Sequence, residues 1–311
     1  MASGIHHVTS IASSARRNLD FYTDTLGLRL VKKTVNFDDP SSYHFYYGDA
    51  AGNPGTILTF FAWEGAAPGR LGIGEAQETV FAVPAGSIGY WTQRLLEKAV
   101  AYDPPTKRFG ETTLAFKDRD GTRLAIVGVK GIEDKAAWSS GGVPAEHAVR
   151  GFHSVSLLLA EADPTAAILT DVFGFGPEGS ESAIERYRAP GLDFGGIIDL
   201  RTAGEFLAAR QGAGSVHHIA FRASDDAAQE AMVRKLVQDH GRHTTEQKDR
   251  KYFRSVYFRE PGRVLFEIAT DPPGFAVDEP PQSLGAALQL PRFLEDRRAQ
   301  IEAELPRLDQ P

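Results

Sequence analysis

The sequence predicts an α+β protein built from four tandem modules, each with the element order β-α-β-β-β. Two observations carry this prediction. Residues 4–10 and 151–157 match each other, and residues 22–28 and 169–175 match in the following element. Two histidine pairs, His6-His7 and His217-His218, also open strands in similar local frames. Agreement in separate elements indicates an internal repeat.

The first module shows the order of elements most clearly. A β-branched strand is expected over residues 7–12 and a helix over 14–26, where Leu19, Tyr22 and Leu26 share one face. Gly27 is a plausible C-terminal stop for that helix. Three further strands are expected over 29–35, 43–47 and 56–61, with a turn over 49–55 between the last two.

The other modules begin near residues 78, 151 and 215. The second has a strand over 78–83, a helix near 87–100 and a last strand over 121–126; the fourth has a strand over 217–221, a helix near 226–240 and a last strand over 262–267. A linker over 130–150 divides the chain. We therefore expect an N-terminal half over 1–145, a C-terminal half over 146–275, and a tail over 276–311 with a helix near 292–305.

Composition excludes several classes of protein. The chain has 311 residues, 34 basic and 41 acidic, with a net charge of −7 and no basic cluster, which argues against nucleic acid as a partner. No apolar run approaches the roughly 20 residues of a membrane span, and no leader pattern opens the chain, so we expect a cytoplasmic protein. Because cysteine is absent, a metal would need His, Asp or Glu ligands, which favours Fe(II), Mn(II) or Zn(II).

The module order resembles the vicinal oxygen chelate superfamily, which contains glyoxalases, extradiol dioxygenases and bleomycin-resistance proteins. The resemblance covers nearly the whole chain. It implies that pairs of modules form half-open mixed β-barrels, so that four modules make two barrels. It also implies that each module can offer one metal ligand from its first strand and another from its last.

The four modules differ at these two ligand positions. The first-strand residues are His7, Thr79, Ser154 and His218, and the last-strand residues are Phe60, Ile126, Asp199 or Leu200, and Glu267. Modules one and four should therefore share the metal barrel, and modules two and three a structural one. Glu267 lies in an apolar strand, where an unpaired carboxylate is costly. Phe60 stands where a four-ligand site has its carboxylate, which leaves three ligands and open positions, as in non-haem Fe(II) oxygenases.

A closer resemblance lies in residues 249–275, DRKYFRSVYFREPGRVLFEIATDPPGF, and in residues 28–34, LRLVKKT. Both stretches are similar to ring-cleaving hydroquinone 1,2-dioxygenases. The resemblance implies Fe(II) held by His7, His218 and Glu267. It also implies that Tyr257 hydrogen-bonds the substrate or bound oxygen, and that Arg250 stabilises developing negative charge.

Other histidines are weaker candidates for a role at the metal site. Strand alternation allows at most one imidazole of each pair to point into the barrel, so His6 and His217 are candidates for orienting the ligands or moving protons; the alternative is that they are ordinary strand histidines. His44 could line the pocket, although packing is the simpler expectation. We expect structural or solvent-exposed roles for His153, His240 and His243.

The leading hypothesis is an Fe(II)-dependent dioxygenase that inserts O2 into a hydroquinone-type ring, with Mn(II) or Zn(II) as alternative metals in purified protein. Its partners would be a small aromatic substrate and O2, with no nucleic acid or membrane, and a homo-oligomer, a dimer, is expected. Two alternatives stay open: a metal-dependent isomerase or lyase of the glyoxalase type, and a non-enzymatic protein that binds a small molecule.

Overall fold

The computed structural model describes residues 3–309 and contains two eight-stranded mixed sheets. The first sheet contains β1 (Ile5–Ala12), β2 (Arg29–Asn36), β3 (Asp39–Gly48), β4 (Ile57–Ala62), β13 (Val216–Ala223), β14 (Lys248–Asp249), β15 (Arg254–Arg259) and β16 (Leu265–Thr270). The second contains β5 (Glu75–Pro84), β6 (Thr106–Arg108), β7 (Glu111–Lys117), β8 (Arg123–Val129), β9 (Gly151–Leu159), β10 (Gly176–Glu181), β11 (Ile184–Arg188) and β12 (Ile197–Thr202).

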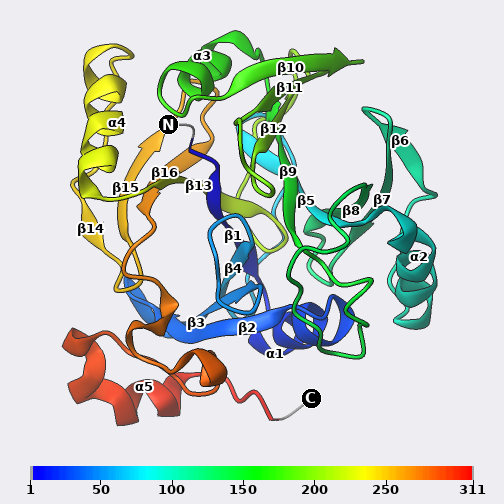
Figure 1. Ribbon diagram of the computed structural model, residues 1–311. Coiled ribbons are helices and arrows are strands. Elements are labelled where there is room, and N and C mark those ends of the chain that lie inside the picture. The colour runs from blue at the N-terminus through cyan, green and yellow to red at the C-terminus, as the bar shows by residue number, and fades with distance from the viewer. Residues whose placement is uncertain (1–2, 310–311) are drawn as a thin grey trace.

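Strand order confirms the predicted pairing of modules. The first sheet runs β14-β15-β16-β13-β1-β4-β3-β2, which joins the fourth module to the first; the second runs β10-β11-β12-β9-β5-β8-β7-β6, which joins the third to the second. Each sheet curls into a half-open barrel, and the two lie side by side (Figure 1). The domain boundaries expected at residues 145 and 275 stay predictions.

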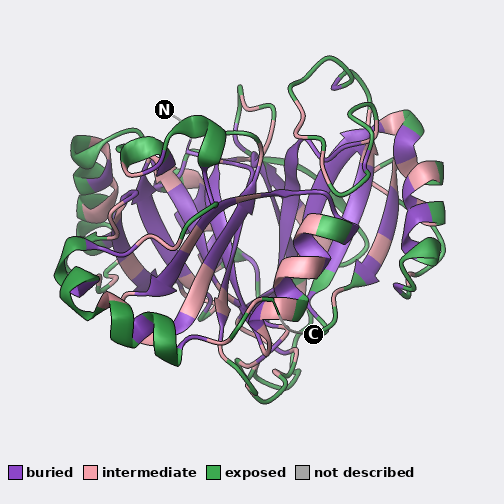
Figure 2. Cartoon of the chain, turned by 90° about the horizontal axis from the view of Figure 1, so that it is seen from below, coloured by how far each residue is buried: buried purple, intermediate pink, exposed green. Residues whose placement is uncertain are grey.

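Helices cover the outside of the barrels. They are α1 (Ala15–Asp20), α2 (Ile88–Glu97), α3 (Asp163–Asp171), α4 (Asp226–Gln238) and α5 (Arg298–Glu304), with short 3-10 segments η2 (Ala85–Ser87), η3 (Phe275–Val277), η4 (Pro281–Ser283) and η5 (Arg292–Arg297). Figure 2 shows buried strands at the centre and exposed helix faces at the periphery. None of the helices within residues 3–309 combines the length and apolar character needed to cross a membrane.

The first predicted helix ends differently from expectation. Residues after Asp20 form a π-helix, η1 (Phe21–Thr25). Its first two residues, Phe21 and Tyr22, both lie in the core, at 4% and 0% exposure.

Strands β1 and β13 form the centre of the first sheet and pair antiparallel. His7 lies opposite Ala220, and Thr9 lies opposite His218. On its other side β1 pairs in parallel with β4, as β13 does with β16. This symmetry brings strands from the two ends of the chain into one barrel. The tail docks on the same barrel, where Leu294 and Ile301 pack with Val35.

Candidate metal centre

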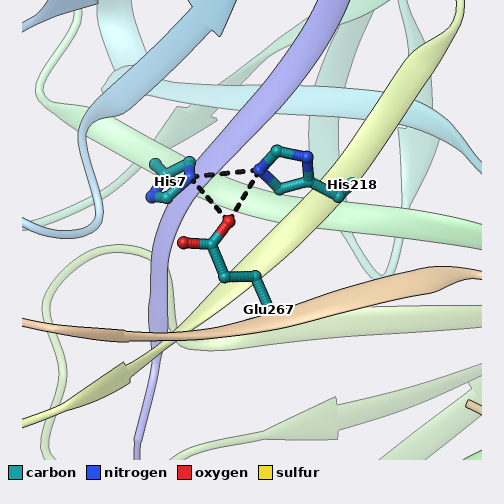
Figure 3. A group of neighbouring side chains, drawn as sticks. All are labelled: His7, His218 and Glu267. Carbon is teal, nitrogen blue, oxygen red and sulfur yellow. Dashed lines mark hydrogen bonds and ion pairs between the residues drawn. The ribbon is translucent and has the colours of Figure 1, made fainter. Parts of the chain in front are cut away.

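Three buried side chains converge inside the first barrel: His7, His218 and Glu267 (Figure 3). The two Nε2 atoms are 3.3 Å apart. Glu267 Oε2 lies 2.8 Å from His218 Nε2 and 3.5 Å from His7 Nε2. Their side chains are at most 4% exposed. Within the described residues they form the one group of three or more His, Asp or Glu side chains with this convergence.

The sheet register produces this convergence. His7 and His218 stand on the two central strands, and Glu267 lies beside Ala220 across the parallel pair β13 and β16. Ala220 in turn lies opposite His7. The small alanine side chain therefore separates the carboxylate strand from the first histidine strand, and the longer Glu267 side chain reaches the space between the two imidazoles.

The donor atoms fit a bound cation. Glu267 Oε2 is fully buried and makes no hydrogen bond, although both imidazoles face it. Ser255 Oγ donates to the other oxygen, Oε1, at 2.5 Å, which leaves Oε2 directed at the imidazoles. Atoms that share one ion at about 2.1 Å are about 3.0 Å apart at a right angle and about 3.4 Å apart at a tetrahedral angle. The observed separations span this range.

The environment of Glu267 and His218 favours their metal-binding protonation states. Burial alone would raise the pKa of Glu267, but the facing imidazoles of His7 and His218 lower it well below the ordinary carboxyl value. Burial also lowers the pKa of His218, despite the neighbouring carboxylate. The site therefore combines an ionised carboxylate with a neutral His218, the forms that bind metal ions.

His6 and His217 lie behind the two converging histidines. His6 Nδ1 contacts His7 Nδ1 at 2.9 Å, and His217 Nδ1 contacts His218 Nδ1 at 2.8 Å. Burial and the adjoining histidine lower the pKa of His6, and the same causes lower the pKa of His217 to about 3. As neutral imidazoles, both can accept the Nδ1–H of their neighbours and leave each Nε2 lone pair directed at the centre.

Tyr257 and Arg250 border the same space. Tyr257 lies directly opposite Glu267 across the antiparallel pair β15 and β16. Arg250 Nε donates to Tyr257 Oη at 3.3 Å, and its Nη2 lies 3.0 Å from Asp38. Burial, followed by the charge of Glu267, raises the pKa of Tyr257, so its phenol stays protonated and can donate.

The predicted position of the missing fourth ligand is wrong by one residue. Phe60 packs against Tyr22 and Tyr47 beneath the helical layer. The neighbouring residue, Thr59, lies beside Thr9 in the register of the parallel strands β1 and β4, just as Glu267 lies beside Ala220 in β13 and β16. Thr59 is therefore the counterpart of Glu267. Because threonine has no carboxylate, the site still has three candidate ligands.

The second sheet carries no equivalent centre within the described residues. In the first sheet His7 lies opposite Ala220, and His218 lies opposite the residue two positions after His7. In the second sheet Ser154, the counterpart of His7, lies opposite Val80, and Glu78 lies opposite Ser156. Glu78, and not Thr79, is therefore the counterpart of His218. Likewise Ala125, which pairs with Val80, replaces Ile126 as the counterpart of Glu267. Asp199, the counterpart of Thr59, binds Arg186 through two hydrogen bonds of 2.7 and 2.8 Å. Glu78 pairs with Arg108.

A cavity of about 30 Å³ opens beside the centre. Besides the predicted residues, it is lined by Thr9, Asn36, Phe37, Asp38, His44, Tyr46, Phe61 and Phe253. His44 thus lines the pocket, the alternative that seemed weaker from sequence. Neither His6 nor His217 is among its lining residues. A larger cavity, of about 600 Å³, lies in the second barrel around Glu78 and Arg108, away from the three converging side chains.

The other four histidines lie elsewhere, the first of them, His147, 3.0 Å from Ser87 Oγ. His153 contacts Glu111 at 2.9 Å and Ser154 at 3.0 Å in the second sheet. His240 approaches Asp171 at 3.4 Å beyond helix α4, and His243 is exposed in the same connection. None of them joins the candidate centre.

Comparison with known proteins finds a family and relatives whose names agree with one another. A family described as the Glyoxalase/Bleomycin resistance protein/Dioxygenase superfamily matches residues 4–126. The chain is 45% identical over 302 residues to the Bacillus subtilis protein named "Putative ring-cleaving dioxygenase MhqO", covering 97% of this chain and 95% of that protein. It is 32% identical over 300 residues to "Chlorohydroquinone/hydroquinone 1,2-dioxygenase" of Sphingobium indicum, covering 94% and 92%.

Solved structures agree on the fold. A Bacillus subtilis crystal structure described as a "putative dioxygenase" superposes with a TM-score of 0.94 at 44% identity, covering 99% of this chain and 98% of that one. Glyoxalase I from Zea mays superposes with a TM-score of 0.66 at 11% identity, covering 87% and 93%. At that identity the second likeness concerns the fold alone.

Proposed function

This chain belongs to the Glyoxalase/Bleomycin resistance protein/Dioxygenase superfamily, and we propose that it is an Fe(II)-dependent dioxygenase that opens a hydroquinone-type aromatic ring. The observation that carries the proposal is the three-donor set of His7, His218 and Glu267, whose counterpart position at Thr59 lacks a fourth carboxylate. Two imidazoles and one carboxylate with vacant positions are typical of non-haem Fe(II) oxygenases. The similarity to a hydroquinone 1,2-dioxygenase supports the choice of substrate.

Each of the three residues has a defined part in this proposal. His7 and His218 bind through Nε2, and Glu267 binds through Oε2 while Ser255 holds its other oxygen. When bound, Fe(II) supplies Lewis acidity and electrons for the reaction of the ring with O2. His6 and His217 keep the two ligand imidazoles in one tautomer and orientation.

The pocket residues act on the substrate. Tyr257, protonated and directly opposite Glu267, donates a hydrogen bond to a substrate oxygen. Arg250 holds the Tyr257 hydroxyl and adds positive charge at the cavity wall, which stabilises developing negative charge. Phe37 and Phe253 provide apolar surface for the ring and exclude water.

The substrate ring requires more room than the cavity offers. Sites for small ligands usually measure about 300 Å³ or more, and this cavity measures about 30 Å³. Rim side chains must therefore move as the ring enters. Arg250 is suitable, because it is held at the pocket rim by Asp38, whose side chain is largely exposed.

Oxygen uptake tests the proposal. Protein freed of metal and loaded anaerobically with Fe(II) should consume O2 when hydroquinone is added, and catechol should be a poorer substrate. Glu267→Gln should abolish both stoichiometric Fe(II) binding and uptake. Glu111→Gln, which changes a carboxylate in the second sheet, is the matched control and should retain both.

Two outcomes would contradict this function. Failure of the Fe(II)-loaded protein to consume O2 with any para- or ortho-diphenol would overturn it. Isomerase activity on a thiol hemiacetal with Ni(II) or Zn(II), without O2, would assign the chain to the glyoxalase type instead. The expected homodimer is a separate prediction, which light scattering of the purified protein tests.

A further inference from the structure

Four side chains beside the candidate centre are joined in one line of hydrogen bonds. Tyr46 Oη lies 3.1 Å from His44 Nδ1, and His44 Nε2 lies 2.8 Å from Thr59 Oγ1. Thr59 Oγ1 lies 2.9 Å from Thr9 Oγ1. Thr9, Thr59 and Tyr46 are at most 3% exposed. The line begins and ends at the pocket, because both Tyr46 and Thr9 line it.

The line occupies the place of the absent fourth ligand. Thr59 is the counterpart of Glu267, and its hydroxyl points into the barrel toward Thr9. Instead of a carboxylate at the centre, this side of the barrel therefore has a hydroxyl that is engaged with His44. Thr9 lies opposite His218 across the central strand pair, which places its hydroxyl beside the candidate metal ligands.

A neutral imidazole makes such a line directional. It has one N–H and one lone pair, so His44 donates to one neighbour and accepts from the other. Burial lowers the pKa of His44 well below its ordinary value, which is consistent with the neutral form. If Nε2 carries the proton, Tyr46 donates to His44, His44 donates to Thr59, and Thr59 donates to Thr9.

We propose that this directed chain, Tyr46 to His44 to Thr59 to Thr9, makes the Thr9 hydroxyl a hydrogen-bond donor to an oxygen anion held at the centre. Because Thr9 already accepts from Thr59, its own proton is free for a pocket ligand. Successive hydrogen bonds polarise one another, so the chain strengthens this donation. The ligand, a phenolate oxygen of the substrate ring, rests on the proposed function. His44 and Thr59 are thus positioning residues that act through Thr9.

The tautomer of His44 tests the direction without any turnover. In 15N-histidine NMR spectra of the metal-free protein, His44 should carry its proton on Nε2. Thr59→Val removes the acceptor and should move that proton to Nδ1, where Tyr46 can accept it, whereas Thr59→Ser and Tyr46→Phe should leave it on Nε2. A parent protein with the proton on Nδ1, or no change in Thr59→Val, would overturn the proposal.

Binding of a phenolate tests the consequence for the ligand. The probe is 4-nitrophenol, with protein loaded with redox-inert Zn(II). Thr59→Val should weaken its binding about tenfold, the scale of a hydrogen bond to a charged group. Thr9→Val should do the same, and the double variant should lose no more than Thr9→Val alone, because one chain is interrupted in both. Unchanged affinity in Thr59→Val, or additive losses, would contradict the chain.

These measurements separate the two proposals. If the Fe(II)-loaded parent consumed no O2 with diphenols, the dioxygenase function would fail, yet the His44 tautomer and the affinity of the Zn(II) form for 4-nitrophenol would still decide whether the chain exists. If O2 uptake were normal in Thr59→Val and its His44 tautomer matched the parent, the chain would fail and the dioxygenase function would stand.

Discussion

Thr59 and Glu267 occupy counterpart positions on the two sides of the first barrel. Thr59 lies beside Thr9 in the parallel pair β1 and β4, and Glu267 lies beside Ala220 in the parallel pair β13 and β16. The pseudo-symmetric barrel therefore offers a carboxylate from one side and a hydroxyl from the other. Under the proposed function, the missing carboxylate leaves coordination positions at the centre for substrate and O2.

A carboxylate at position 59 should convert the open site into a closed one. Thr59→Glu should lower the melting temperature of metal-free protein, because two buried carboxylates would repel each other. It should also enlarge the rise in melting temperature that Zn(II) produces, and lower O2 uptake. Thr59→Gln is the control of matched size. If Zn(II) stabilised both variants equally, the counterpart relationship would have no role in metal binding.

The histidines behind the candidate ligands should control metal affinity. Replacing His6 or His217 with Leu removes the contact to Nδ1 of His7 or His218. Such a loss typically weakens metal binding about 10- to 100-fold. His6→Asn should restore part of the affinity, because its amide oxygen can lie near the lost Nδ1 position. Competition with a chromophoric chelator measures the metal affinity. If His6→Leu bound metal as tightly as the parent, the orientation of the His7 imidazole would not depend on His6.

A buried lysine should be essential for the stability of the tail contact. Lys32 is fully buried, with its ammonium 2.6 Å from Asp278 and paired with Glu279. Removing one partner of a buried ion pair typically costs about 3–5 kcal/mol. Urea unfolding of Lys32→Met should show a loss of that order. Lys33→Met is the matched control, since Lys33 has no ion pair among the described residues, and an equal loss in both variants would refute the role of the pair.

Glu75 should make stability depend on pH. Burial raises the pKa of Glu75 to about 7 from an ordinary value of 4.5. Between these values the folded chain keeps a proton that the unfolded chain releases, so the contribution of this group to stability falls as pH rises through this range. Glu75→Gln should therefore gain melting temperature relative to the parent between pH 5 and pH 8. A difference that stayed constant with pH would contradict the raised pKa.

The sequence was sufficient to predict the modules, their pairing and the three converging residues. Repeated segments and paired histidines can be recognised in the sequence without a structure. The offset from Phe60 to Thr59 was not predictable, because pairing register, and not the run of Thr-Phe-Phe, decides which residue faces the barrel. The same one-residue error separates Thr79 from Glu78, where the pairing of β5 with β9 is shifted by a bulge.

The role of His44 was also hidden in the sequence. It lies in an aromatic strand, where packing is the ordinary explanation, and its partners Tyr46 and Thr59 come from the same strand and the next one. Ser255 gives no signal either, because its contact with Glu267 depends on two strands that meet only in the folded sheet. Side-chain contacts across strands need the register before they can be inferred.

The fate of oxygen atoms tests the central claim most directly. Fe(II)-loaded protein should be given hydroquinone under 18O2, and the product analysed by mass spectrometry. The account predicts one O2 consumed per hydroquinone and both labelled atoms in a ring-opened product, with none formed by Glu267→Gln. Formation of unlabelled benzoquinone, with O2 reduced to peroxide or water, would contradict it.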